Sequence, residues 1–149
     1  MEETTKEIDN LMRNIHKLLV KYTKDHLKSY SLTVPRFKTL WTVSINQPIN
    51  MSNLHNKMYL AKSTLTVIVD RLVEDGLLKR HRDSHDRRVV LVEITEQGQK
   101  YLDELLQIRQ NYLQHALAEL DQGEKKHLIE LLSPILSKLK KDLKEDSLF

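Results

Sequence analysis

The segment from Leu72 to Arg88 constrains the fold of this chain more than any other part of the sequence. An apolar-periodic stretch ends at Gly76, and glycine readily takes the left-handed conformation with which many helices end. Leu77 and Leu78 then restart the chain as a strand. Arginines flank the polar turn that follows, over residues 82–87. The segment therefore predicts a helix that leads directly into a β-hairpin with a cationic tip.

Guanidinium groups on a protruding turn can reach the phosphates or the minor groove of DNA. The net charge of the chain is only +3, and both signs of charge are mixed along the sequence. The local concentration of arginines in the hairpin therefore indicates a nucleic-acid partner better than the total charge does.

Glycine and proline are scarce, with three of each in 149 residues, so helices should dominate the fold. There is no cysteine, which suits a reducing compartment and excludes a thiolate metal site. The N-terminus is acidic, unlike a signal peptide, and no apolar run approaches the ~20 residues of a membrane span. We expect a soluble cytoplasmic protein with no membrane partner.

Apolar spacing and capping residues predict the helices of the N-terminal half. The first helix should run from about Thr5 to Lys28, with Thr4 and Glu7 as its capping box. Thr33, followed closely by a proline, should start the second helix, and Pro48 should end it.

The centre of the chain predicts a helix-turn-helix followed by a hairpin. Asn50 can cap a short third helix that reaches about Met58, and a fourth helix follows from about Lys62 to Asp75. β-Branched residues over 89–94 should form the second strand of the hairpin, beside residues 77–80.

Two further helices are predicted after the hairpin. Thr95 should cap the fifth helix, and Asp121 with Glu124 should open the sixth as another capping box. Pro134 lies inside the sixth helix and should bend it.

The predicted fold class is mainly α with a small β-hairpin wing (α+β), a winged helix-turn-helix with N- and C-terminal dimerisation helices. We expect a single domain over residues 1–149, with the winged lobe at 33–98. The apolar faces of segments 1–30 and 100–149 exceed what one lobe can cover, which predicts a homodimer. The alternative is that these helices pack on each other within one subunit.

The chain resembles the multiple antibiotic resistance regulator (MarR) family of bacterial winged-helix transcription factors. The wing pattern D-x-x-D-x-R, at its spacing from Asp-Gly-Leu, is the most specific signal. Four stretches carry the resemblance: STLTVIVDRL at 63–72, DGLLKR at 75–80, DSHDRR at 83–88 and ITEQG at 94–98.

The resemblance implies a homodimeric transcriptional regulator, acting as a ligand-responsive repressor on a pseudo-palindromic operator in double-stranded DNA. Its fourth helices would enter major grooves, where Ser63, Thr64 and Thr66 face the bases. Arg87 would contact DNA from the wing, with Asp86 as its positioning partner. The whole DNA-binding set is expected to be Lys62, Ser63, Thr64, Thr66, Val67, Arg71, Arg82, Asp86, Arg87 and Arg88. For Arg71, an internal salt bridge is as good an interpretation as a phosphate contact.

Four positions depart from the family pattern. His55 lies inside the third helix, where relatives often carry a small residue such as alanine. Tyr59 occupies a turn where relatives carry glycine or asparagine, so we expect a wider turn. Ala61 replaces the serine that caps the recognition helix of relatives. Val67 stands where many relatives have arginine or lysine, so base readout should rest on hydroxyls and on contact with thymine methyls.

Two other classes of function compete with this interpretation. A histidine-based metal-responsive regulator is suggested by His81 and His85 in the hairpin, but two ligands fall short of a zinc site, and we expect no metal or cofactor. The second competing class is a winged-helix protein-interaction module without DNA binding. No phosphate loop, nucleophile elbow or His-Glu metal motif is present, so we do not expect an enzyme.

The family also suggests an effector, a small aromatic or anionic molecule bound between the dimerisation helices and the lobe. Tyr22, His26, Phe37 and Trp41 could line such a site. At helical spacing, the same residues also suit an ordinary hydrophobic core.

Overall fold

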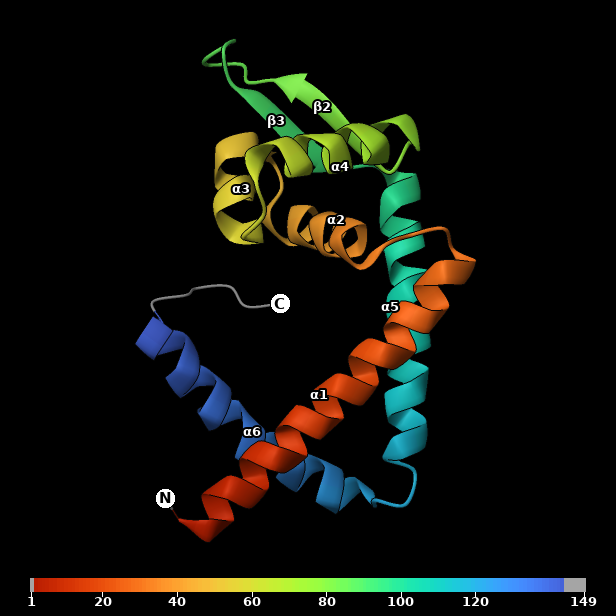
Figure 1. Cartoon of the computed structure of the whole chain (residues 1–149), viewed down its shortest axis with the longest axis vertical. Coiled ribbons are helices and arrows are strands. Elements are labelled where there is room, and N and C mark those ends of the chain that lie inside the picture. The colour runs from red at the N-terminus through yellow and green to blue at the C-terminus, as the bar shows by residue number, and fades with distance from the viewer. Residues whose placement is uncertain (1, 144–149) are drawn as a thin grey trace. The chain divides into compact units, whose positions relative to one another are not determined.

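A computed structural model describes residues 2–143 of the chain and confirms the predicted fold class (Figure 1). The described part contains six helices and one small antiparallel sheet. The elements are α1 (Glu3–Ser29), α2 (Val34–Asn46), β1 (Ile49–Asn50), α3 (Met51–Met58), α4 (Lys62–Glu74), β2 (Leu78–Arg82), β3 (Val90–Ile94), α5 (Glu96–Ala116) and α6 (Gln122–Leu143).

The chain divides into two compact units, one up to Arg109 and one from Gln110 onward. The first unit contains α1, the helix-turn-helix and the sheet, and the second contains the end of α5 and all of α6. The expected single domain over 1–149 includes residues 1 and 144–149, which lie outside the described residues, and it stays a prediction.

Most of the predicted helix caps are confirmed. The Thr33 hydroxyl accepts a hydrogen bond from the Arg36 amide at 3.4 Å, and the Asn50 side chain accepts one from the Asn53 amide at 2.8 Å. The carboxylates that open α6 bond reciprocally: Glu124 N–H donates to Asp121 at 2.8 Å, and Asp121 N–H donates to Glu124 at 2.9 Å.

The predicted capping box of α1 is wrong. The helix begins at Glu3, with an extended Glu2 as its N-cap and no side-chain cap. Because the Lys6 amide already donates to the Glu2 carbonyl at 3.2 Å, the first turn closes before Thr4 can act as a cap.

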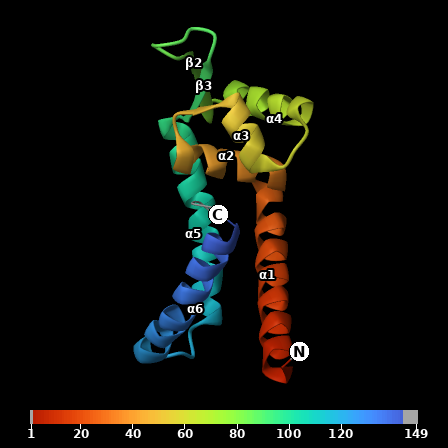
Figure 2. The same cartoon turned by 90° about the vertical axis from the view of Figure 1, so that its left-hand side faces the viewer.

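The sheet contains a strand that the sequence analysis missed. β1 pairs with β3, where Ile49 lies opposite Val92, and the strand order is β1-β3-β2. A two-residue strand is too short to show the alternation that identifies strands in a sequence. The β2–β3 hairpin, which we call the wing, extends past α2, α3 and α4 (Figure 2).

Thr95 closes the base of the wing. Its hydroxyl donates to the Gly76 carbonyl at 2.6 Å and accepts from the Gly98 amide at 2.9 Å, and its own amide donates to the Leu77 carbonyl at 3.1 Å. A side chain at Gly98 would place its Cβ 2.0 Å from the Leu77 oxygen, so only glycine fits there. Gly76 takes the predicted positive φ, 74°.

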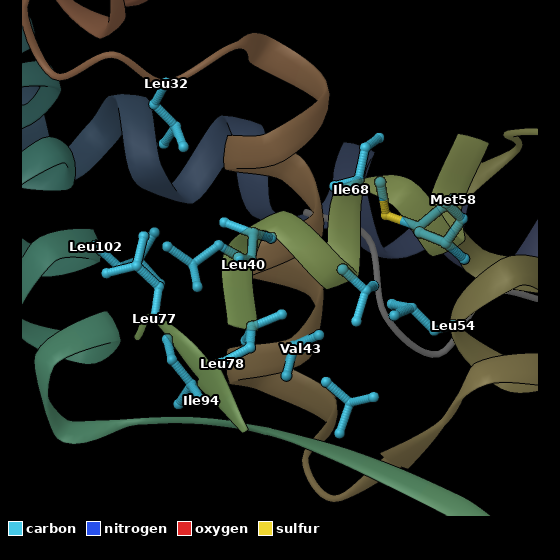
Figure 3. Close-up of a cluster of buried hydrophobic side chains, with 14 of the residues drawn as sticks. Leu32, Leu40, Val43, Leu54, Met58, Ile68, Leu77, Leu78, Ile94 and Leu102 are labelled. Carbon is cyan, nitrogen blue, oxygen red and sulfur yellow. The ribbon is translucent and has the colours of Figure 1, made fainter. Parts of the chain in front are cut away.

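One hydrophobic core holds the winged lobe together (Figure 3). Leu40, Val43 and Leu54 are fully buried, and Figure 3 shows them in one cluster with Leu78 and Met58. Burying side chains of this size stabilises the lobe by about 1.5–3 kcal/mol each. The core therefore fixes α4 and the wing to the same support.

The helices near the chain ends carry exposed apolar side chains. On α1, Ile15 and Leu18 are 54% and 56% exposed. On α6, Ile129 is 64% exposed, and several leucines of that helix are about half exposed. No helix within residues 2–143 is long and apolar enough to span a membrane.

Candidate nucleic-acid interface

α4 has one buried and one exposed face. Leu65, Ile68, Val69 and Leu72 are buried in the core of the lobe. The exposed residues of α4 include Lys62, Ser63, Thr64, Thr66, Val67 and Arg71, all from the predicted DNA-binding set. The structure thus brings the predicted major-groove residues together on one helix.

The turn before α4 is tight, so the expectation of a wider turn is wrong. Tyr59 takes a left-handed φ of 53°, and α4 begins three residues later, at Lys62. A non-glycine residue in this region is strained and needs support from the surrounding structure. Ala61 is the N-cap of α4. Because alanine has no polar side-chain group, it makes no capping hydrogen bond.

The hydroxyls of α4 are not equivalent. Among residues 2–143, those of Ser63 and Thr64 have no hydrogen-bond partner. The Thr66 hydroxyl donates to the Lys62 carbonyl at 2.9 Å, one turn back in the helix. Ser63 and Thr64 can therefore donate or accept towards a ligand, whereas Thr66 can only accept while this bond persists.

Two ion pairs occupy the second half of α4. Arg71 donates to Glu74 at 3.0 Å, and both side chains are about two-thirds exposed. Arg80 of β2 lies 2.5 Å from the Asp70 carboxylate and so joins the helix to the wing. For Arg71, the structure shows the internal pair, which solvent weakens because both groups are exposed.

The wing turn is held by its own hydrogen bonds. The Arg82 guanidinium donates to the Arg87 carbonyl at 2.6 Å. The Asp83 amide donates to the Val89 carbonyl at 3.0 Å, and the Val89 amide donates to the Asp86 carbonyl at 2.9 Å. Arg82 therefore supports the shape of the turn.

Asp86 is not the positioning partner of Arg87 that we expected. Its carboxylate accepts hydrogen bonds from the amide and the guanidinium of Arg88, at 3.0 to 3.2 Å. The Arg88 guanidinium and then the Arg88 amide lower the pKa of Asp86 below its ordinary value. The pair joins the second aspartate and the arginine of the D-x-x-D-x-R pattern, so that pattern describes an internal contact of the wing.

Arg87 is exposed, and among the described residues its guanidinium has no hydrogen-bond or ion-pair partner. Because its neighbours Arg82 and Arg88 are both engaged within the turn, Arg87 is the wing arginine with all its donors available.

The four residues expected around an effector do not form one described cavity. The rings of Tyr22 and His26 stack with centroids 4.0 Å apart on α1, and Phe37 and Trp41 are half-buried against the core. A cleft of about 490 Å³ lies nearby in the first unit, with Arg36, Arg71 and Tyr101 among its lining residues. Burial raises the pKa of Tyr101 above its ordinary value.

A histidine metal site finds no support in the part of the chain that the structure describes. No group of three histidine, aspartate or glutamate side chains within residues 2–143 could hold a metal. His81 lies 2.9 Å from a Glu93 carboxylate oxygen and so pairs with an acid on the neighbouring strand.

A helix-turn-helix followed by a β-hairpin wing on one core defines a winged-helix protein, the class established by this geometry. Residues 32–90 match the MarR family model. The solved structure of a MarR family protein from Bacillus stearothermophilus is similar over 97% of this chain and 99% of that one, with a TM-score of 0.80 and 32% identity. The chain belongs to the MarR family of transcriptional regulators.

Two curated relatives agree with this assignment. The HTH-type transcriptional regulator YsmB of Bacillus subtilis is 29% identical over 95% of this chain and 94% of its own length. The HTH-type transcriptional repressor IacR of Pseudomonas putida is 29% identical over 76% of this chain and 68% of its own length. Because its relatives are transcriptional regulators, the chain is a regulator and not an enzyme.

Proposed function

We propose that this protein is a repressor that binds a pseudo-palindromic operator in double-stranded DNA as a homodimer. One observation carries the proposal: α4 presents small polar side chains, while the wing presents Arg87 without a partner among residues 2–143. Small hydroxyl side chains allow a helix to approach base edges, and an arginine on a wing suits phosphates or the minor groove. The relative IacR is named a transcriptional repressor, and this name supports repression as the mode of regulation.

Homodimerisation is proposed through segments 1–30 and 100–149, with the lobe at 33–98 as the DNA-binding part. α1 and α6 each carry apolar side chains that stay exposed in a single chain. Large exposed apolar surfaces mark association sites, and a two-fold dimer would present two copies of α4 to successive half-sites.

Sedimentation equilibrium tests the dimer. Replacing Leu132 and Leu139 together by glutamate places charges one heptad apart on α6, and should weaken dimerisation by on the order of 100-fold, because an unpaired charge is costly to bury. Ser137→Glu adds the same charge at an exposed serine of α6 and is the control. A full-length protein that is monomeric at micromolar concentration contradicts the dimer.

Selection from a random duplex library, followed by a salt titration, tests DNA binding. Affinity should fall steeply with salt, because phosphate contacts release counterions, and one inverted repeat should be enriched. Absence of binding at low salt would favour the winged-helix protein-interaction module.

An effector remains part of the proposal, and the cleft beside Arg36 favours an anionic one. Arg36 donates to the Ser31 carbonyl at 3.2 Å, pairs with Asp75, and keeps a buried Nε with no partner among the described residues. Benzoate, a small aromatic carboxylate, is a suitable probe. It should shift the NMR signals of Arg36 and Tyr101, and an unchanged spectrum at millimolar benzoate would contradict this site.

A further inference from the structure

Val67 is an apolar side chain on the outward face of α4. It is 67% exposed, and it lies opposite the helix face that packs into the core. Ser63, one turn earlier on the same face, and the neighbouring Thr66 are both exposed and small. A large exposed apolar group at this position has nothing within its own helix to cover it.

The side chains that read purines by paired hydrogen bonds are scarce on α4. Arginine and lysine suit guanine, and asparagine and glutamine suit adenine. α4 contains no asparagine or glutamine, its only arginine is Arg71, which pairs with Glu74 at 3.0 Å, and Lys62 lies at the very start of the helix. Between Ser63 and Asp70, α4 therefore has no side chain that could recognise a purine by paired hydrogen bonds.

The nearest hydroxyl is also restricted. Thr66 uses its proton for the Lys62 carbonyl at 2.9 Å, so its oxygen can accept from a base but cannot donate to one. Between the free hydroxyls near the start of α4 and the ion pairs near its end, the surface offered to a groove is mainly methyl groups.

We propose that Val67 is a specificity-determining residue that recognises the 5-methyl group of a thymine in the major groove. The thymine methyl is the apolar feature of base edges in that groove, and an apolar side chain distinguishes thymine from cytosine through it. This inference rests on the DNA binding proposed above and adds the kind of base that the centre of α4 selects.

Deoxyuridine substitution tests the proposal, because deoxyuridine differs from thymidine only by the absent methyl. Full-length protein is first used to select a preferred duplex, and each thymine of a half-site is then replaced in turn. At one position the wild-type protein should lose about fourfold in affinity, which corresponds to ~0.8 kcal/mol for one buried methyl-sized group. Val67→Ala should bind the thymine and uracil duplexes equally well.

Ile45→Ala is the matched control, since Ile45 is an exposed apolar residue on α2, outside α4 and outside the segments proposed for dimerisation, and the variant should keep the wild-type response to uracil. Circular dichroism checks that Val67→Ala is folded, which is the expected result for a substitution at an exposed site. Enrichment of a sequence that tolerates uracil at every position would overturn the role of Val67 and leave DNA binding intact. A uracil penalty that persists in Val67→Ala would do the same, whereas no enrichment at all would overturn both proposals.

Discussion

The helix α4 and the wing lie on the same core but present their polar groups in opposite ways. In the wing, Arg82 and Arg88 are bound within the turn, and Arg87 is left available. In the first half of α4, Ser63 and Thr64 have free hydroxyls, within the part of the chain that the structure describes. The turn of the wing is thus held in shape by its own contacts and presents one available cation, Arg87. The first half of α4 instead presents small hydroxyl groups that can bond to a ligand.

Substitutions in the two elements should therefore affect DNA binding in different ways. A side chain that reads base edges matters only on the matching sequence, whereas a cation that contacts the backbone matters on every sequence. Single substitutions in α4 and in the wing can test that distinction on the proposed DNA complex.

Thr64→Ala should cost ~1–3 kcal/mol on the selected operator and much less on random DNA, because contacts to base edges exist only where the sequence matches. Fluorescence anisotropy on both duplexes measures the two losses. Thr5→Ala, an exposed threonine on α1, is the control. Equal losses on both duplexes would show that Thr64 positions α4 and does not read bases.

Arg87→Ala should weaken binding to all sequences by about 1 kcal/mol, the net value of one exposed contact to a charged group. The slope of log affinity against log salt should fall by about 1. Arg109→Ala, an exposed arginine on α5, should change neither quantity. An Arg87→Ala protein with wild-type affinity and salt slope would assign Arg87 to the solvated surface.

Arg82→Ala should weaken DNA binding by about 0.5 kcal/mol, because the lost hydrogen bond to the Arg87 carbonyl holds the turn and not the DNA. Amide hydrogen exchange over residues 83–89 should become faster in the free protein. If exchange is unchanged while the salt slope falls by about 1, Arg82 contacts DNA directly.

Glu74→Gln should have the smallest effect, because an exposed ion pair contributes only about 0.2–1 kcal/mol. The substitution frees Arg71 and removes a negative charge from α4, so affinity for every sequence should rise by about twofold, which corresponds to ~0.4 kcal/mol and lies within that range. A loss of affinity would instead show that Glu74 holds Arg71 in a DNA-binding position.

Local chemistry made the starts of α2, α3, α5 and α6 predictable from the sequence, whereas the capping box predicted for α1 did not form. Thr33, Asn50, Thr95 and Asp121 act as caps because a short polar side chain can bond an amide two or three residues away, whatever the rest of the chain does. The apolar spacing of α4 likewise placed its buried face correctly.

The predictions were wrong or incomplete where contacts with other parts of the chain decide the local structure. Asp86 lies within two residues of both Arg87 and Arg88, and only the backbone path of the turn selects Arg88. β1 exists because Ile49 meets Val92 across the sheet, a contact that no local pattern encodes. The left-handed Tyr59 similarly depends on the packing of α3 and α4 around the turn.

The closure of the hairpin at Thr95 has a consequence for how such regulators can be altered. Its hydrogen bonds to Gly76, Leu77 and Gly98 join the end of α4 to the start of α5 without using any residue of the turn. The length of the turn is therefore independent of the spacing of the helices. Residues inserted between Ser84 and His85 would extend the footprint of the protein on flanking DNA and leave the base preference of α4 unchanged, so footprint and sequence preference can be engineered separately.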